Sequence, residues 1–194
     1  MDMQNYYEAE LSEHRQVLED TQDAISHPFK RLVEISCKAL DRGGKLLFFG
    51  NGGSAADSQH IATELTVRYQ KDRRAIAAMA LSTDTSALTA IGNDFGFDHL
   101  FSRQIEALAK PQDVAIGIST SGNSTNVIKA LETARDIGAT AAAFAGCEGG
   151  KLNNLADPIL VVPSNTTSRI QEMHILIGHL LCGAIERELK LVQE

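Results

Sequence analysis

The sequence has few cysteines and no long apolar run. Its three cysteines, Cys37, Cys147 and Cys182, are far apart and form no CxxC pair. This usage argues against a disulfide framework or a zinc–thiolate site and indicates a reducing compartment. The longest apolar stretch, residues 175–185, is interrupted by His179 and is too short to span a bilayer. We therefore expect a soluble, cytoplasmic protein with no membrane partner.

The chain also lacks a run of Lys and Arg, and its net charge is −7. Because a nucleic-acid footprint normally appears as a basic patch, we expect no nucleic-acid partner. Residues 1–14 are acidic and polar, unlike a secretory signal peptide. The length of 194 residues, with 43% hydrophobic and 22% charged residues, fits one domain of ordinary composition.

Hydrophobic periodicity divides the chain into three regions. We predict an N-terminal helical region over about 1–42, with one helix at 3–24 and a second from Pro28 to about Leu40. An α/β core over about 45–163 and a C-terminal helix over about 166–192 complete a single domain, 1–194. In the core, predicted strands at 45–49, 75–81, 113–118, 140–145 and 158–162 alternate with helices at 54–69, 85–91, 98–109 and 125–137. This alternation predicts a three-layer α/β fold with a five-stranded parallel sheet flanked by helices.

The predicted C-terminal helix is apolar nearly all round from Met173 to Ile185. Such a helix is normally buried on all sides. In a domain of this size, we expect it to pack against another subunit. Gly178 and Gly183 would allow close approach between helices.

The stretch from Leu46 to Tyr69 is typical of a buried strand, a glycine turn and a helix. Gly50, Gly52 and Gly53 allow a sharp turn and close approach to a ligand, and Ser54 is a candidate helix cap. The turn also satisfies the G-x-G-x-x-A dinucleotide pattern. That alternative ranks lower because the acidic residue that should close the second strand has no good candidate; Asp84 comes too late.

His60 and Glu64 stand one turn apart on the helix behind this loop, so their side chains share a face. They could hold one metal ion or share one proton. A third ligand would decide the matter, and His179 is the best candidate because a polar side chain in an apolar helix needs a partner. Gln171 lies two turns earlier on roughly the same side, whereas His174 lies on a different face and is expected to be structural. This donor set suits zinc or a similar divalent ion.

The segment STSGNS, residues 119–124, places four hydroxyl side chains between a strand and a helix. Hydroxyls and free amides at a helix start can form a phosphate cradle without a lysine. The alternative is a polar turn in which Ser124 merely caps the next helix. The density of hydroxyls at the carboxyl end of a strand favours the phosphate site.

Four motifs together resemble the phosphoheptose isomerases of the sugar isomerase (SIS) fold. They are GNGGSAADSQHIATEL, IGNDFGF, ISTSGNSTNVIKAL and RIQEMHILIGHLL, and the resemblance covers nearly the whole chain. It implies conversion of sedoheptulose 7-phosphate, a phosphorylated seven-carbon sugar, to glycero-manno-heptose 7-phosphate, an early step toward bacterial surface heptose and lipopolysaccharide. It also implies a homotetramer with active sites between subunits and one divalent ion, zinc, in each site.

The resemblance assigns roles to residues of this sequence. Glu64 and His179 would be catalytic, with Glu64 as the base that moves a proton between C1 and C2 through an enediol. The metal ligands would be His60, Glu64, Gln171 and His179. Substrate contacts would be Asn51, Gly52, Gly53, Glu64, Asn93, Asp94, Ser119, Thr120, Ser121, Ser124 and Gln171. One departure is Ser168, because some members have an acidic residue just before the RIQE motif.

Two alternatives stay open. The SIS fold also includes a non-catalytic tetramer that binds the bacterial replication initiator. The resemblance implies that this relative lacks the Glu and the second His of the metal site, which this chain has as Glu64 and His179. The second alternative is an isomerase of another phosphosugar, since a phosphate cradle does not read chain length.

Overall fold

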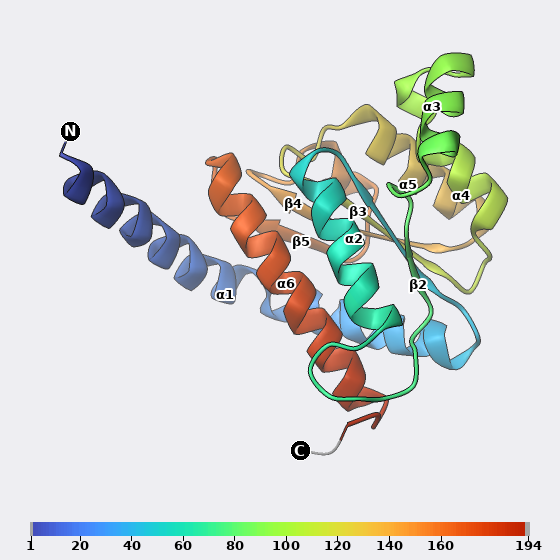
Figure 1. Cartoon of the computed structure of the whole chain (residues 1–194), viewed down its shortest axis with the longest axis horizontal. Helices are drawn as coiled ribbons and strands as arrows, with labels where there is room; N and C mark the ends of the chain where they lie inside the picture. The colour runs from blue at the N-terminus through green and yellow to red at the C-terminus, as the bar shows by residue number, and fades with distance from the viewer. Residues whose placement is uncertain (1, 193–194) are drawn as a thin grey trace.

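The computed structural model describes residues 2–192, which form a parallel five-stranded sheet covered by helices on both faces (Figure 1). The order across the sheet is β2-β1-β3-β4-β5, which confirms the expected α/β fold. Residues 1, 193 and 194 of the predicted domain lie outside the described residues. The strands are β1 (Leu46–Gly50), β2 (Ala78–Ala80), β3 (Val114–Ser119), β4 (Thr140–Gly146) and β5 (Ile159–Val162).

The helices divide between the two faces of the sheet according to the hydrophobic cores that they join. The first core packs α1, α2 and α6 against one face, and the second packs α4 and α5 against the other. The helices are α1 (Met3–Asp41), α2 (Gly53–Thr66), α3 (Thr85–Asp94), α4 (Ser102–Leu108), α5 (Thr125–Ile137) and α6 (Thr167–Glu188), with 3-10 turns η1 (Phe97–His99) and η2 (Gly150–Asn154).

Strand β1 shows why these short runs form the centre of the sheet. Leu46 and Phe48 belong to the first core, and Leu47 and Phe49 belong to the second. Successive side chains of a strand point to opposite faces, so a strand covered on both faces must be apolar throughout. All five residues of β1 are buried.

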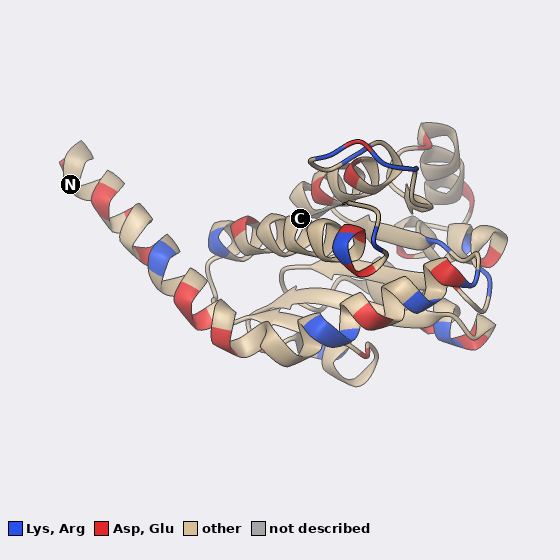
Figure 2. Cartoon of the chain, turned by 90° about the horizontal axis from the view of Figure 1, so that it is seen from below, with Lys and Arg blue, Asp and Glu red and all other residues tan. Residues whose placement is uncertain are grey.

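The two predicted N-terminal helices are one helix, α1, with Pro28 inside it. Pro28 has no N–H to donate to the Ala24 carbonyl, but Ala24 is exposed and water can take the donor's place. The buried Ile25 and Leu32 hold both halves against the domain. Figures 1 and 2 show the axis of α1 changing direction along its length, the usual effect of an internal proline. Figure 2 also shows acidic and basic residues interspersed along this helix.

Several predicted boundaries were wrong. Strand β2 is shorter than residues 75–81 because its pairing with β1 spans Ala78 to Ala80. The predicted 98–109 helix is split into η1 and α4, and α3 continues past residue 91 to Asp94. The N-cap of α2 is Gly52, at a φ of 55°, so Ser54 lies inside the helix and is not its cap. The last helix ends at Glu188, before residue 192.

His174 is structural, as expected from its face of α6. It is fully buried, and its Nε2 lies 3.1 Å from the Ala145 carbonyl oxygen, so a neutral ring can donate there. Burial lowers the pKa of His174 to about 4 from 6.5. Along the described residues, no helix is both long enough and apolar enough to cross a membrane.

The low pKa of His174 leads us to expect that the folded protein loses stability at acid pH. As pH falls below about 6.5, the unfolded chain binds a proton at His174 that the folded chain does not bind until pH is about 4. The free energy of unfolding should therefore fall by about 3 kcal/mol between pH 7 and pH 4 through this group. His174→Gln keeps a hydrogen-bond donor but cannot titrate in this range. The free energy of unfolding, measured with urea at pH 7 and pH 4, should therefore fall by about 3 kcal/mol more in wild type than in His174→Gln. Equal pH slopes for the two proteins would contradict the assignment.

Candidate active site

The loops after β1 and β3 lie side by side at the carboxyl edge of the sheet, because these strands are neighbours and Gly50 pairs with Ile118. A pair of amides joins them. Asn51 Nδ2 donates to Asn126 Oδ1 at 2.9 Å, and Asn126 Nδ2 donates back to Asn51 Oδ1 at 2.9 Å. Asn126 is buried on the first turn of α5. The glycine loop, Asn51 to Gly53, is therefore fixed beside the start of α5.

The serine turn, residues 119–124, leads directly into the N-terminus of α5. Ser124 is at the N-cap position, but its side chain makes no capping hydrogen bond; instead its Oγ lies 3.0 Å from Ser119 Oγ. Ser124 is therefore not merely a cap, which was the alternative explanation of this segment. A helix start offers unpaired N–H groups and a positive dipole end, which together favour a phosphate.

Gly149 and the first residues of η2 hold the serine turn from the side. Gly122 has a φ of +64°, and a Cβ there would overlap the Gly149 carbonyl. Leu152 N–H donates to the Gly122 carbonyl at 3.3 Å, and Lys151 N–H donates to Asn123 Oδ1 at 3.2 Å. Asn123 Nδ2 donates to the Ser121 carbonyl at 2.8 Å. These contacts set the shape of the turn and leave Ser121 exposed toward solvent.

The structure brings His60, Glu64 and His179 together from α2 and α6. The Nε2 atoms of His60 and His179 are 2.9 Å apart, and His60 Nε2 is 3.5 Å from Glu64 Oε1. Half of the His60 side chain and about a fifth of Glu64, 49% and 19%, are exposed. His179 is also partly exposed, so a small molecule can reach a carboxylate and two imidazoles at one place.

Close packing between α2 and α6 explains this convergence. A Cβ at Gly178 would overlap the Ile61 side chain, so glycine is needed where the two helices meet. Cys182 Sγ lies 3.9 Å from the Ile61 carbonyl oxygen. The close approach expected of Gly178 thus occurs within the chain, and it brings His179 beside His60.

The structure does not place three predicted site residues, Gln171, Asn93 and Asp94, in contact with the histidine pair, His60 and His179. The Gln171 amide packs over Gly53, since a Cβ there would lie 2.6 Å from Gln171 Nε2. At the ordinary helical rise, Gln171 is about 12 Å before His179 along α6. Asn93 and Asp94 are exposed at the end of α3, where Asn93 Nδ2 donates to Asp94 Oδ1 at 2.7 Å. Gln171 therefore sits with the glycine loop.

Asp57 is a titratable group near the site that the motifs did not single out. It lies three residues before His60 on α2, and its Oδ2 is buried without a hydrogen-bond partner among residues 2–192. Burial raises the pKa of Asp57, and the charge of His60 partly opposes this shift. Asp57 lies three residues before His60 and seven before Glu64, a spacing that places the three side chains on one face of a helix, and this spacing could have identified it from the sequence.

The donor set is chemically suited to a zinc ion. Ligand atoms around one tetrahedral zinc lie roughly 3.3 Å apart, given bonds of about 2.0 Å. The separations of 2.9 Å from His60 Nε2 to His179 Nε2 and 3.5 Å from His60 Nε2 to Glu64 Oε1 are close to that value. Within residues 2–192, however, no group of three or more His, Cys, Asp or Glu side chains is arranged as a metal site.

Comparison with known proteins gives consistent matches. The model of the SIS domain family matches residues 7–146. Phosphoheptose isomerase of Paramagnetospirillum magneticum is 58% identical over 186 residues, covering 96% of this chain and 97% of that protein. The structure of phosphoheptose isomerase from Neisseria gonorrhoeae superposes with a TM-score of 0.90 at 43% identity, over 96% of this chain and 100% of that one. The structure of a phosphoheptose isomerase from Francisella tularensis gives a TM-score of 0.92 at 33% identity, over the same shares, 96% and 100%.

Proposed function

The chain belongs to the phosphoheptose isomerase family of SIS-domain proteins, and on this basis we propose that it converts D-sedoheptulose 7-phosphate to D-glycero-D-manno-heptose 7-phosphate. The observation that carries the proposal is the pairing of two features at one edge of the sheet. A serine-lined helix start lies next to the loop that leads into the helix of His60 and Glu64. The product would supply heptose for bacterial lipopolysaccharide, and the site of action would be the cytoplasm.

The phosphate would be held by the serine turn and the first turn of α5. Ser119, Ser124 and the exposed Ser121 offer hydroxyls, and Thr120 completes the set of predicted contacts. Because Gly149 and the first residues of η2 fix the turn that carries these donors, the donors need little reorganisation when the substrate binds. The sugar chain would then extend along the glycine loop, Asn51 to Gly53, toward Gln171.

Isomerisation moves one proton from C1 of the ketose to C2 of the aldose through an enediol. We assign the base to Glu64, which takes the C1 proton and returns it at C2. His179 would exchange a proton with the sugar oxygens as their charge develops, and its contact with His60 holds the ring in place. A carboxylate thus carries the carbon-bound proton while an imidazole serves the oxygens.

We also propose that His60, Glu64, Gln171 and His179 hold one zinc ion per site. When bound, the ion would act as a Lewis acid on the sugar oxygens. A carboxylate that binds zinc tightly is a poorer base, so Glu64 would be a weak or exchangeable ligand. The two imidazoles, already in contact, would be the firmer ligands. Gln171 would have to turn away from Gly53 to join them.

Replacing His60 with Ala should remove bound zinc. The variant loses one of the two imidazole ligands, so zinc content measured by mass spectrometry after dialysis should fall well below that of wild type. His27→Ala is the control, because His27 is an exposed histidine on α1, remote from α2 in the chain. If His60→Ala retains zinc, His60 is structural.

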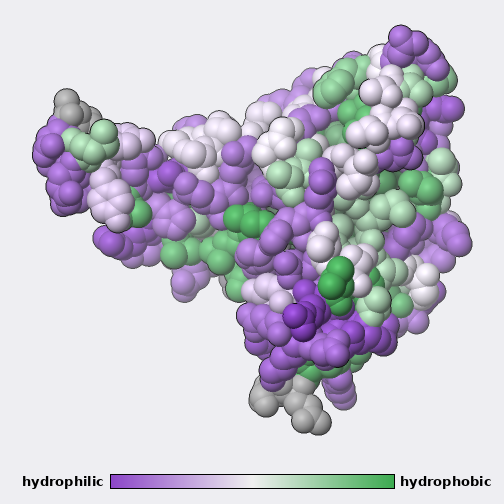
Figure 3. Space-filling model, in the orientation of Figure 1, coloured by the Kyte–Doolittle hydropathy of each residue, from purple (hydrophilic) through white to green (hydrophobic). Residues whose placement is uncertain are grey.

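A homotetramer is proposed as the working form. Apolar side chains line a surface pocket of about 270 Å³ between α1 and α6, and Leu180 beside it is 49% exposed. Figure 3 shows apolar surface where α1 passes α6. A second copy covering this face would bury it, as expected for the apolar C-terminal helix. We also propose that the active sites lie between subunits and that the exposed Asn93 and Asp94 contact the substrate there.

The proposal is tested by following the reaction in D₂O by NMR. Sedoheptulose 7-phosphate with the purified, zinc-loaded protein should give the aldose, with deuterium at C2 in those turnovers in which protonated Glu64 exchanges with solvent before it returns the proton. Deuterium at C2 would support the enediol route, because a direct hydride shift from C1 to C2 incorporates none. No conversion would favour the non-catalytic binding protein, despite the retained Glu64 and His179.

A further inference from the structure

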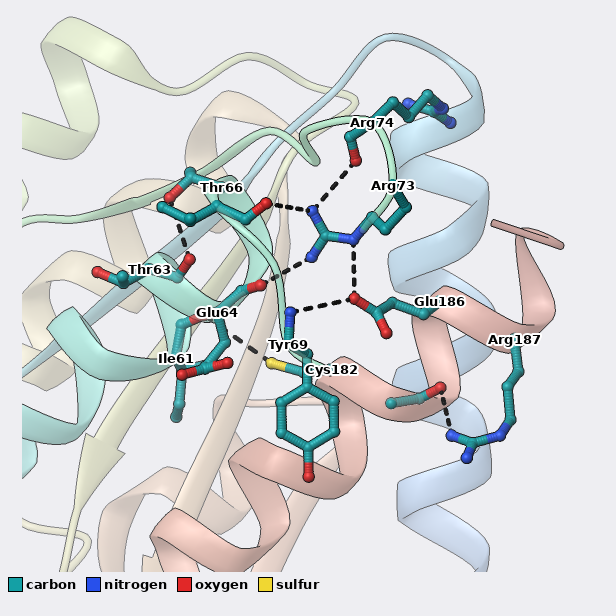
Figure 4. A network of polar contacts seen from close by, with 12 residues as sticks. Ile61, Thr63, Glu64, Thr66, Tyr69, Arg73, Arg74, Cys182, Glu186 and Arg187 are labelled. Carbon is teal, nitrogen blue, oxygen red and sulfur yellow. Dashed lines mark hydrogen bonds and ion pairs between the residues drawn. The ribbon is translucent and has the colours of Figure 1, made fainter. Parts of the chain in front are cut away.

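A buried ion pair joins the segment that follows α2 to the last turns of α6 (Figure 4). Arg73 Nε lies 2.8 Å from Glu186 Oε1, and the two side chains are 1% and 3% exposed. Arg73 comes from the segment after α2, and Glu186 is one of the last residues of α6. The pair therefore ties together the two helices that carry His60, Glu64 and His179.

The rest of the Arg73 guanidinium binds backbone carbonyls around the end of α2. Its Nη2 donates to the Glu64 carbonyl at 2.7 Å, and its Nη1 donates to the carbonyls of Val67 and Arg74 at 3.2 and 3.1 Å. The last carbonyls of a helix have no partner within the helix. Arg73 thus supplies that partner at Glu64 itself, the residue assigned as the base.

Glu186 reaches the other half of the site through Tyr69. The Tyr69 backbone N–H donates to Glu186 Oε1 at 3.3 Å. The Tyr69 ring stacks on the His179 ring, with centroids 5.6 Å apart and planes at 24°. One carboxylate therefore anchors both Arg73, which holds the backbone of Glu64, and Tyr69, which backs His179.

We infer that Arg73, Glu186 and Tyr69 are positioning residues that set Glu64 relative to His179 for proton transfer. This inference rests on the proposed isomerase function. The three residues need not touch the sugar; they fix the helix end and the ring on which the two assigned catalytic side chains depend. The phosphate cradle on β3 and α5 lies outside this network. Loss of the network should therefore lower kcat and leave KM little changed.

The geometry requires arginine specifically. Three guanidinium nitrogens make the four contacts, and a lysine ammonium is a single point charge that cannot span them. Arg73→Lys keeps the charge opposite Glu186 but loses most of the carbonyl contacts. This variant separates the positioning of α2 from simple neutralisation of a buried carboxylate.

The experiment compares variants of the network with matched controls. Arg73→Lys, Glu186→Gln and Tyr69→Leu should each lower kcat about 10- to 100-fold, the usual cost of losing a supporting contact. Tyr69→Phe keeps the ring and should retain kcat. Asp113→Asn is the control for ion-pair loss, because Asp113 is 1% exposed and pairs with Lys45 at 2.5 Å, at the amino ends of β1 and β3. It should lower the melting temperature but not kcat.

A second measurement does not depend on turnover. The ring signals of His179 in NMR spectra should shift in Arg73→Lys and Glu186→Gln, which keep the Tyr69 ring, and stay in place in Asp113→Asn. Wild-type kcat together with unshifted His179 signals in these two variants would overturn the inference. Should wild type itself fail to convert the sugar, the proposed function fails, and the His179 signals still decide whether the network positions that ring. Should Glu186→Gln not fold, the Tyr69 pair gives the same answer.

Discussion

Glu64→Gln should lower kcat by about 10²- to 10⁴-fold, the range typical of losing a general base. The amide has nearly the shape of the carboxylate but cannot take the C1 proton. The substitution should not disturb the fold, because Glu64 is only partly buried and its side-chain contact is His60 at 3.5 Å. The rate should be measured at saturating sedoheptulose 7-phosphate, with circular dichroism as the check on folding.

Two controls make this result specific to the base. Glu132→Gln removes a carboxylate that is exposed on α5, and it should leave kcat unchanged. Zinc content measured in parallel separates loss of the base from loss of a metal ligand, because an amide oxygen can still bind the ion. A Glu64→Gln protein that is folded, zinc-loaded and fully active would show that Glu64 is not the base.

The second large effect is expected from Gly122→Ala in the serine turn. A Cβ at this position would overlap the Gly149 carbonyl, and the backbone has a φ of +64°, which alanine adopts poorly. The turn must shift, and the hydroxyls that face the phosphate shift with it. Hydrogen bonds to a charged group are worth about 1.5–3 kcal/mol each, so losing one should raise KM roughly 10- to 100-fold.

Gly138→Ala is the matched control for backbone strain. Gly138 has a φ of +92° at the C-cap of α5, at the opposite end of the helix from the cradle. Among residues 2–192, a Cβ there would meet only Pro111, at 3.6 Å. It should lower stability through its φ but leave KM unchanged. Equal KM values for both variants and wild type would show that the phosphate does not bind at the serine turn.

The sheet could be predicted where the local pattern had one physical meaning. The runs LLFF and VAIGI could hardly be other than buried strands, because a parallel strand covered on both faces is apolar at every position. Pro28 was different, since a proline fits both the first turn of a helix and a bend inside one. The choice depended on the contacts of Ile25 and Leu32 with the rest of the domain, which sequence spacing does not give.

The site residues likewise divide into those marked by a local sequence pattern and those identified only by contacts with distant residues. The spacing of His60 and Glu64 and the hydroxyls of residues 119–124 are local patterns, and the structure brings His179 to the first pair. Asn126 and Arg73 were missed because their partners are far away in the chain, 75 residues for Asn51 and 113 for Glu186. No periodicity marks such pairs. The roles assigned to all of these residues remain predictions. Among residues 2–192, no hydrogen bond or ion pair joins Gln171 or Asn93 to His60 or His179.

The most direct test of the account is the specificity of the purified, zinc-loaded protein among ketose and aldose phosphates. We predict that kcat/KM for sedoheptulose 7-phosphate exceeds the values for arabinose 5-phosphate and fructose 6-phosphate. The glycine loop is open at Gly52, where a Cβ would meet no atom of residues 2–192 within 4 Å, and this space beyond the phosphate cradle suits a longer chain. A higher kcat/KM for either shorter sugar would contradict the proposed substrate. Absence of turnover with all three would contradict the assignment as an isomerase.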